Sequence, residues 1–463
     1  MPWRRIFPLK GSPREPVFDV SFATRCLIAL YFMTNDSIAV IGLGYVGLPL
    51  CLQFARSGVT VLGVDIDPSK VESLSSGRSY IKHIESSAIT EMTASGRLEA
   101  TTDFRRISTV GAVIICVPTP LNKNREPDIS FILETGRALA PYLSKGTVVV
   151  LESTTYPGTT DEDLLAELEQ GSGLKAGVDF HLAFSPERED PGNDLSKVKV
   201  VPKVIGGLTP ACLAKAQAVY SRAIDTLVPV SSCRVAEATK LLENIFRSVN
   251  IALVNELKVV YEAMGIDVWE VINAAKTKPF GFMAFYPGPG LGGHCIPIDP
   301  FYLTWKAREF GQNTRFIELA GEINTRMPEH VVHRVADALN NHGKAVKGSR
   351  ILILGLAYKP NVDDERESPS YLLMDLLNDR GAELEYHDPY VPVIRPTREH
   401  PQYAGIVSVP WNQETVSSFD VVLISTNHAC VNYDELAAWA PCIVDTRNAM
   451  ASVPTAAGQV MKA

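Results

Sequence analysis

The chain lacks a surplus of positive charge, because its 52 acidic residues outnumber its 44 lysines and arginines and leave a formal net charge of −8. This balance argues against a binding surface for nucleic acid or for an anionic membrane. A local anion site made of backbone N–H groups would not show in the total charge.

The eight cysteines include no CxxC pair and show no spacing that is typical of metal ligands. We therefore expect reduced thiols, no metal site and a cytoplasmic protein.

Long apolar runs are also missing from the sequence. The uninterrupted run from Cys26 to Met33 is far shorter than the roughly 18 residues that a membrane span needs, so no membrane segment is expected. Residues 1–36 precede the first strong motif, and Met33 stands almost directly before a predicted strand. We expect residues 1–36 to be a disordered extension, or residues 1–32 to lie upstream of the native start.

A glycine-rich turn follows the first predicted strand, Ser37 to Ile41. In Gly42-x-Gly44-x-x-Gly47 the first glycine permits a tight turn, the second lets a pyrophosphate approach the backbone, and the third lets helix and strand pack closely. A second strand ends at Asp65, whose carboxylate would accept the ribose hydroxyls and repel a 2′-phosphate, which favours NAD over NADP. The plainer alternative is a glycine-rich turn without a ligand. The predicted cofactor contacts here are Gly42, Gly44, Tyr45, Val46, Gly47 and Asp65.

Two further apolar runs, at residues 111–121 and 146–160, end in hydroxyl residues and proline. Ligands bind at the carboxyl ends of strands in open parallel sheets, so we expect Thr119, Ser153 and Thr154 to face the nicotinamide. Serine and threonine also cap loops, which is the alternative explanation.

The pattern changes between Ser232 and Gly265 to one long helix of about 45 Å, which can bridge two domains and form a dimer seam. Lys240 and Asn244 are four residues apart and share a helix face. Without further context, Lys240 is as well explained as a surface lysine paired with Glu243. The apolar residues at helical spacing are Leu241, Leu242, Ile245, Val249, Ala252, Leu253 and Leu257.

A second strand-turn unit begins near residue 349, with further strands predicted in 383–389, 419–426 and 442–448. Its glycine fingerprint is degenerate and keeps only Gly355. The predicted fold class is α/β, with two Rossmann-like doubly wound domains joined by a long central helix, and the two halves would form a cleft.

The segment GPGLGGHCIPIDP, residues 288–300, surrounds Cys295 with glycines and prolines, so it is neither helix nor central strand. Such a frame would hold the cysteine in one place, with Asp299 four residues later.

Eight segments together resemble the UDP-glucose/GDP-mannose dehydrogenase family in order and spacing. They are VIGLGYVGLPL, VPTPLN, STTYPGTT, SPERE, EATKLLENIFRSVNIALVNE, PGPGLGGHCIPIDP, GLAYKPNVDDERESP and DTRN. The resemblance covers nearly everything after residue 36. It implies a cytoplasmic homodimer or higher homo-oligomer, divided into an NAD-binding domain at 37–230, a central domain at 231–340 and a UDP-sugar-binding domain at 341–463.

The resemblance also implies a four-electron oxidation of a primary alcohol to a carboxylate with two NAD. The aldehyde would be trapped by a cysteine as a thiohemiacetal, oxidised to a thioester and hydrolysed. Cys295 matches the nucleophile. The remaining catalytic matches are Lys240 and Asn244 for oxyanionic intermediates, Asp299 for the hydrolytic water with Lys240, Thr154 for orienting water, and Glu187 as a proposed base.

The residues that the resemblance assigns to substrate and cofactor lie in several segments. Lys359 would reach the substrate, and Arg366 would reach NAD across the cleft. The loop Phe285, Tyr286, Pro287 and Gly288, with Gly292, would wrap the nucleotide, and Arg447 would read the same end. The substrate-binding set also includes Glu187, Arg188, Lys240 and Asn244.

Two departures bear on the sugar. Members that use UDP-glucose follow the proline-glutamate pair with an aromatic residue and leucine, whereas this chain has Arg188-Glu189-Asp190-Pro191-Gly192, and Ile298 replaces their lysine before the catalytic aspartate. Both changes favour an N-acetylated hexose. UDP-N-acetylglucosamine is the first choice, while UDP-N-acetylgalactosamine, UDP-N-acetylmannosamine and UDP-glucose remain open.

Two other classes share the fold. A two-electron hydroxyacid dehydrogenase would also use a helix lysine but gives no reason for Cys295, and it would form one NADH per substrate. A non-catalytic protein that senses NAD and a nucleotide would have little use for Cys295, Lys240 and Asp299 together.

Overall fold

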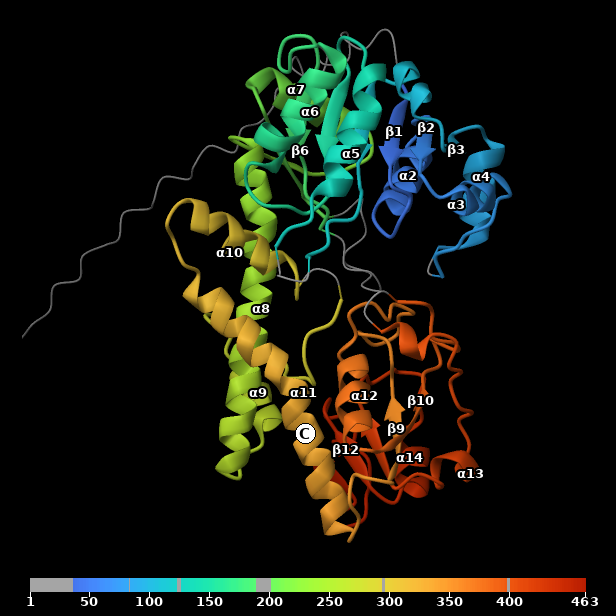
Figure 1. Cartoon of the computed structure of the whole chain (residues 1–463), viewed down its shortest axis with the longest axis vertical. Coiled ribbons are helices and arrows are strands. Elements are labelled where there is room, and N and C mark those ends of the chain that lie inside the picture. The colour runs from blue at the N-terminus through green and yellow to red at the C-terminus, as the bar shows by residue number, and fades with distance from the viewer. Residues whose placement is uncertain (1–35, 83, 123–125, 189–200, 294–295, 398–399) are drawn as a thin grey trace, which may run out of the picture.

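The structure is a computed structural model of the 463-residue chain, and it describes residues 36–82, 84–122, 126–188, 201–293, 296–397 and 400–463. The extension that was predicted for residues 1–36 lies almost wholly outside these residues, and so does Cys295. Two α/β domains lie at opposite ends of the molecule, and long helices run between them (Figure 1).

The N-terminal domain is built on an eight-stranded sheet in the order β3-β2-β1-β4-β5-β6-β7-β8. All neighbouring strands are parallel except β6 and β7, which pair antiparallel. In chain order the strands are β1 (Ile38–Ile41), β2 (Val61–Val64), β3 (Leu98–Thr101), β4 (Ala112–Ile115), β5 (Val148–Leu151), β6 (His181–Phe184), β7 (Lys203–Gly207) and β8 (Leu227–Val230).

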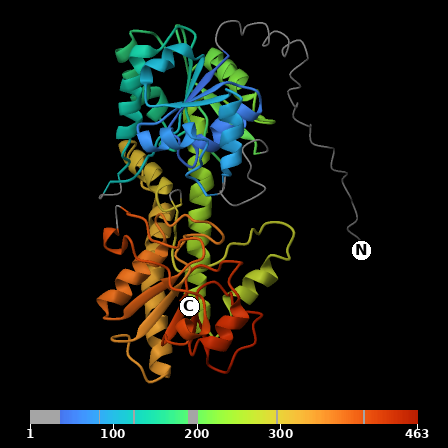
Figure 2. The same cartoon turned by 90° about the vertical axis from the view of Figure 1, so that its right-hand side faces the viewer.

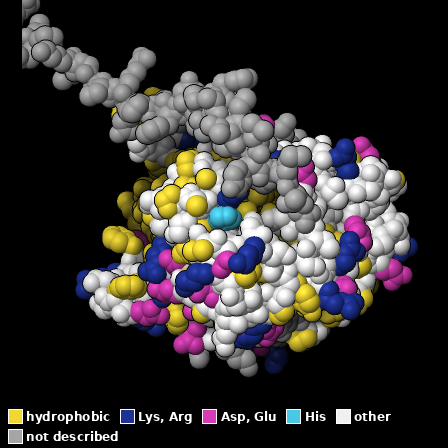
Figure 3. Space-filling model, turned by 90° about the horizontal axis from the view of Figure 1, so that it is seen from above, with side chains coloured by type: hydrophobic (Ala, Val, Ile, Leu, Met, Phe, Trp, Pro, Cys, Tyr) yellow, Lys and Arg dark blue, Asp and Glu magenta, His cyan; other side chains and the backbone are white. Residues whose placement is uncertain are grey.

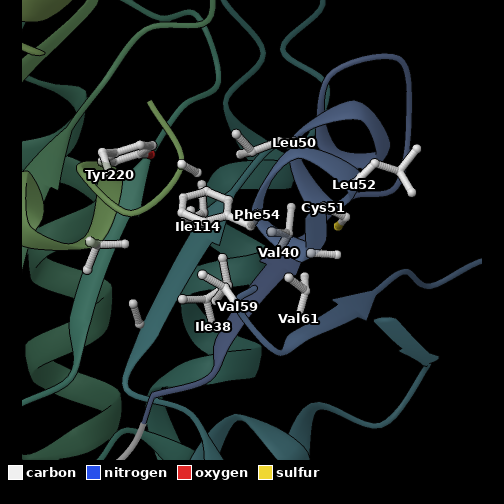
Figure 4. Close-up of a cluster of buried hydrophobic side chains, with 14 of the residues drawn as sticks. Ile38, Val40, Leu50, Cys51, Leu52, Phe54, Val59, Val61, Ile114 and Tyr220 are labelled. Carbon is white, nitrogen blue, oxygen red and sulfur yellow. The ribbon is translucent and has the colours of Figure 1, made fainter. Parts of the chain in front are cut away.

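Both faces of this sheet are covered by apolar packing. Within β1, Ile38 and Val40 point into one cluster of buried side chains, and Ala39 and Ile41 point into another. Figure 4 shows the first cluster, in which Phe54 lies over the strands. This alternation explains why the strands read as continuous apolar runs. The helices of the domain are α2 (Gly47–Arg56), α3 (Pro68–Ser75), α4 (Ser86–Ala94), α5 (Ser130–Leu139), α6 (Leu165–Ser172) and α7 (Pro210–Tyr220), with short helical turns η1 (Phe104–Thr109), η2 (Ala140–Tyr142) and η3 (Thr159–Leu164).

The central helix α8 (Cys233–Ala263) is 31 residues long and begins at Ser232, whose hydroxyl accepts a hydrogen bond from the Val235 N–H. It runs from the first domain to the second beside α11 (Arg315–Asn341), as Figures 1 and 2 show. The shorter helices α9 (Val268–Ala275) and α10 (Asp299–Glu309) complete this part. The two long helices are joined by a buried hydrogen bond from Asn255 Nδ2 to Asn324 Oδ1 of 2.9 Å.

The C-terminal domain has a parallel sheet of five strands in the order β10-β9-β11-β12-β13. Its strands are β9 (Arg350–Leu354), β10 (Glu383–His387), β11 (Val421–Ile424), β12 (Ile443–Asp445) and β13 (Val460–Lys462). Helices α12 (Pro369–Asp379), α13 (Gln413–Val416) and α14 (Tyr433–Trp439) and the short turn η5 (Pro401–Tyr403) accompany them.

The predicted fold class is confirmed, but four strands, β3, β7, β8 and β13, were not predicted. Strands β7 and β8 extend the first sheet, and β8 is weakly marked in sequence because its residues are partly exposed and include Pro229. Strand β13 has only three residues at the end of the chain.

None of the described helices is long and apolar enough to cross a membrane. Among the described residues, no group of histidines, cysteines and acids is arranged to hold a metal ion. Figure 3 shows basic and acidic side chains interspersed on the described part of the face seen from above.

Candidate active site between the two domains

The three glycines of the fingerprint are required for different reasons. Gly42 has a φ of +92°, and a Cβ there would lie 2.5 Å from the Cys116 carbonyl oxygen. A Cβ at Gly47 would lie 1.9 Å from the Gly42 oxygen, so helix α2 can approach strand β1 only without a side chain. A Cβ at Gly44 would meet nothing within 4 Å. Gly44 therefore faces open space at the start of α2, where the family fingerprint places a pyrophosphate.

Asp65 stands directly after strand β2 and is only 5% exposed. Its Oδ2 accepts a hydrogen bond of 2.8 Å from the Leu43 N–H within the glycine-rich turn, and Lys70 Nζ lies 3.0 Å from the same oxygen. The carboxylate is thus fixed against the fingerprint turn, where it can meet a ribose bound there.

The serine and threonine residues after β4 and β5 take part in hydrogen bonds that connect these two loops with each other and with α10. Ser153 Oγ donates a 2.7 Å hydrogen bond to the Val117 carbonyl, and the Thr119 carbonyl accepts one from Tyr302 of α10. Thr154 is half-buried in the same loop. The contact with nicotinamide predicted for these three residues stays a prediction.

A buried polar cluster joins α8 to the start of α10. Lys240 is 7% exposed, Asn244 is fully buried and Asp299 is 4% exposed. The Asn244 amide donates a hydrogen bond to Asp299, and Arg247 donates one to the Asn244 oxygen. Lys240 is therefore not the surface lysine that the sequence alone allowed, and Glu243 pairs instead with Arg188, at 2.6 Å.

Burial sets the acidity of this cluster. It raises the pKa of Asp299 to about 7, although the charge of Lys240 and the Asn244 hydrogen bond favour the ionised form. A carboxyl group that titrates near neutral pH can both take up and release a proton there. Asp299 is also the first residue of α10, so the glycine-proline segment that contains Cys295 ends at this cluster. Cys295 itself lies outside the described residues.

The SPERE segment is held by charged groups on both sides. Glu187 Oε2 lies 2.9 Å from Lys203 Nζ, and Lys203 also contacts Glu152, at 3.0 Å. Lys203 is 4% exposed, and the Tyr220 hydroxyl donates a hydrogen bond to Glu152. Arg188 reaches Glu243 on α8 beside the buried cluster. This network brings Glu187 and Arg188 to the same side of the molecule as Lys240 and Asn244.

Several residues of this network were not predicted from the sequence. Lys203 is the first residue of strand β7, and Glu152 directly follows strand β5. A charged residue in or beside an apolar strand is the sequence feature that could have identified them. Glu237, one turn before Lys240 on α8, accepts hydrogen bonds from Gly158 N–H, Thr160 N–H and the Thr160 hydroxyl. Glu237 thus fixes the loop that bears Thr154.

The predicted nucleotide loop packs against both the long helix and the C-terminal domain. The Gly288 N–H donates a 3.1 Å hydrogen bond to Asn255, and a Cβ at Gly288 would lie 2.5 Å from Arg447 Nη1. Arg447 donates a 2.8 Å hydrogen bond to the Ser425 carbonyl, and burial lowers its pKa to about 10. Gly288 and Arg447 therefore lie side by side, and their contact with a nucleotide stays a prediction.

The other members of this loop are fixed by ring packing and by close backbone approach. Phe285 packs edge-on against Phe246, and Tyr286 stacks on Trp269 at 5.5 Å. Pro287 is buried. A Cβ at Gly292 would lie 2.7 Å from the Tyr358 Cβ, beside the half-buried Lys359. The loop consequently leads from α9 to the segment after β9.

Arg366 connects the two domains at the cofactor fingerprint. Its guanidinium group lies 4.5 Å from the ring centre of Tyr45 and forms a bidentate pair with Asp364, at 2.8 and 2.6 Å. Arg366 thus lies against the glycine-rich turn, and its predicted contact with NAD stays a prediction.

Comparison with known proteins places this architecture in a family. Three models of the UDP-glucose/GDP-mannose dehydrogenase family match successive parts of the chain: its NAD-binding domain over residues 36–224, its central domain over 234–326 and its UDP-binding domain over 352–452. The chain belongs to this family. It is an oxidoreductase of the nucleotide-sugar dehydrogenase class that uses NAD.

Individual relatives narrow the comparison. UDP-N-acetyl-D-glucosamine 6-dehydrogenase of Pseudomonas aeruginosa is 35% identical over 398 residues, which cover 86% of this chain and 92% of the relative. UDP-N-acetyl-D-mannosamine dehydrogenase of Escherichia coli K12 is 34% identical, covering 86% and 94%. The solved structure of a UDP-D-ManNAc dehydrogenase from Pyrococcus horikoshii superposes with a TM-score of 0.82 at 32% identity, covering 92% of this chain and 98% of that one.

The buried Asp299 predicts a pH-dependent stability. Because burial raises its pKa in the folded state above the unfolded value, the folded protein binds the extra proton, and stability should fall as pH rises from about 4 through about 7. Asp299→Asn removes this ionisation. We therefore expect the unfolding free energy of Asp299→Asn minus that of the unsubstituted protein to be a few kcal/mol larger at pH 8 than at pH 5, with both proteins measured by denaturant unfolding at each pH. A difference between the two proteins that does not change with pH would contradict the raised pKa.

Proposed function

We propose that this enzyme oxidises the C6 alcohol of a UDP-N-acetylhexosamine to a carboxylate in two successive two-electron steps, with UDP-N-acetylglucosamine as the preferred substrate. The observation that carries the proposal is the buried cluster of Lys240, Asn244 and Asp299 between the NAD-binding fingerprint and the Gly288–Arg447 contact. NAD, when bound at the fingerprint, would supply the hydride acceptor for both steps.

The trap for the intermediate is the thiol of Cys295. As a thiolate it adds to the C6 aldehyde left by the first oxidation, forming a C–S bond and an oxyanion. We assign to the Lys240 ammonium and the Asn244 amide the role of stabilising that negative charge. Loss of a second hydride from C6 of the thiohemiacetal gives a thioester.

Asp299 serves the last step. With its pKa near 7, the ionised carboxylate takes a proton from a water molecule, oriented by Thr154, as the water oxygen attacks the thioester carbon. The C–S bond breaks, the thiolate of Cys295 leaves, and the product carboxylate departs. Lys240 holds the charge of the tetrahedral intermediate.

Glu187 is proposed as the base that removes the proton of the C6 hydroxyl in the first oxidation. Its ion pair with the buried Lys203 supports this role, because the contact fixes the position of the carboxylate. Arg188, anchored to Glu243, is proposed to contact the sugar beside it.

The remaining residues hold the two ends of the ligands. Phe285, Tyr286, Pro287, Gly288 and Gly292 form the nucleotide loop, with Arg447 and Lys359 as its cationic partners for the diphosphate. Thr119 and Ser153 lie at the nicotinamide end. Arg366 acts with Tyr45 beside the cofactor pyrophosphate.

The preference for an N-acetylated sugar is supported by Arg188 and Ile298, which replace the residues usual in UDP-glucose enzymes, and by the printed names of the relatives. The mannosamine and galactosamine epimers and UDP-glucose remain the alternatives. A nucleotide-sugar substrate and reduced cysteines also support a cytoplasmic location.

The proposal predicts both the stoichiometry and the order of substrates. With limiting substrate and excess NAD, absorbance at 340 nm should show two NADH per UDP-N-acetylglucosamine, because the aldehyde stays trapped until the second oxidation. UDP-N-acetylgalactosamine, UDP-N-acetylmannosamine and UDP-glucose should show kcat/KM values at least about tenfold lower, a difference of about 1.4 kcal/mol in transition-state binding.

One NADH per substrate would reject the four-electron scheme and favour a hydroxyacid-type reaction. Higher kcat/KM for another sugar of the panel would correct the substrate. Binding of NAD and every UDP-sugar without turnover would favour a non-catalytic sensor.

We also propose a homodimer that forms along α8. Leu242, Phe246, Leu253, Val260 and Met264 recur at intervals of four and seven residues and form one stripe, on which Leu242 is 67% and Leu253 is 51% exposed. A stripe of large apolar side chains on a long helix is typical of a self-association surface, and a second copy presents the same stripe. The apolar residues of α8 thus divide into a buried set, such as Leu241 and Ala252, and this exposed set.

The dimer is tested by a charge in the middle of the stripe. Leu253→Glu should convert the protein to a monomer at micromolar concentration in sedimentation velocity, because two carboxylates would be buried against apolar side chains. Val178→Glu is the matched control, since Val178 is 78% exposed in the N-terminal domain, away from α8. The proposal fails if the Leu253→Glu protein sediments as the unsubstituted protein does.

A further inference from the structure

A second polar site lies farther along α8. A cavity of about 360 Å³ is lined by residues from α8, α9, α11 and β13, namely Lys258, Glu262, Asp267, Trp269, Arg334 and Lys462 among others. Lys258 follows Asn255 by three residues, so it lies one turn beyond the contact with the nucleotide loop and on the same helix face. None of the catalytic residues proposed above lines this cavity.

Two of the three cations that line the cavity already have carboxylate partners. Arg334 Nε lies 2.6 Å from Glu262, and its Nη1 lies 3.1 Å from Asp337. Lys462 Nζ lies 2.5 Å from Asp267. Lys258 is different, because its Nζ is buried and has no hydrogen-bond partner among the described residues. The charge that remains unmatched in the cavity lining is therefore that of Lys258.

A bare ammonium group in this position is costly. Lys258 is only 5% exposed, and moving an unpaired ammonium from water into a protein interior is unfavourable. Burial lowers its pKa to about 8; the charge of Glu262 opposes this shift and the charge of Arg447 adds to it, so at pH 7 Lys258 is still mainly protonated. Burial and the charge of Lys258 also lower the pKa of the adjacent His330, which therefore adds little positive charge at that pH.

We propose that this cavity is a binding site for a small oxyanion, of the class of phosphate, and that Lys258 is its principal ligand. The anion supplies the hydrogen-bond acceptors that Lys258 lacks. Arg334 and Lys462 flank the site from α11 and β13, so an anion there links the long helices to the end of the C-terminal domain. Arg447, which we assign to the substrate nucleotide, does not line this cavity.

The test uses the full chain saturated with NAD and UDP, so that the nucleotide pockets are already filled. Inorganic phosphate is titrated by isothermal calorimetry at pH 7 and constant ionic strength, with sulfate and chloride in parallel. We expect one phosphate per chain, with sulfate similar and chloride much weaker. Lys258→Met should weaken phosphate binding at least about tenfold. Lys145→Met, an exposed lysine of the N-terminal domain, should leave it unchanged.

Three outcomes would overturn the proposal. Phosphate affinity that is equal in Lys258→Met and in the unsubstituted protein would mean that Lys258 is merely solvated. Phosphate that binds only when UDP is absent would assign the anion to the substrate pocket. If Lys258→Met does not fold, tungstate-soaked crystals of the unsubstituted protein decide the matter. An anomalous peak within hydrogen-bond distance of Nζ supports the site, and its absence there overturns it.

Discussion

The hydrogen bond between Asn244 and Asp299 is the contact on which the rest of the architecture depends, because it buries a carboxylate where the middle of α8 meets the start of α10. Burial raises the pKa of this carboxyl group into the neutral range, and Lys240 beside it supplies a positive charge. Neither effect would persist at the surface, where solvent screens both groups. The chemistry proposed for Cys295 therefore depends on how α8 is packed.

Helix α8 meets that requirement by fixing parts of both domains. Glu237 holds the loop that follows β5, Glu243 holds Arg188, and Asn255 holds the nucleotide loop at Gly288. These contacts are made at successive positions along one helix. The rise per residue of the helix therefore sets the distance between the loops proposed to bind the cofactor and the loop proposed to bind the nucleotide. Arg366 packed on Tyr45 closes the other side of the interdomain space.

The sequence predicted what depends on local pattern and could not predict what depends on distant partners. The fingerprint glycines and the 31-residue helix follow from spacing, because steric limits and helical periodicity act within a few residues. The pairing of Lys203 with Glu152 and Glu187 joins segments far apart in the chain, and no local rule indicates it. For the same reason periodicity could not tell the buried Leu241 from the exposed Leu242. The role of Lys240 came from resemblance, and its burial came only from the fold.

The central claim is that Cys295 forms a thioester that Asp299 then helps to hydrolyse. The most direct measurement is mass spectrometry of the chain after an acid quench during turnover with NAD and UDP-N-acetylglucosamine. The account predicts that Asp299→Asn accumulates a hydroxylamine-sensitive adduct of the oxidised UDP-sugar on the peptide containing Cys295. Cys295→Ala should show neither adduct nor carboxylate product, while Cys442→Ala, which changes a buried cysteine of the other domain, should behave as the unsubstituted protein. Carboxylate formation at an undiminished rate by Cys295→Ala would contradict the account.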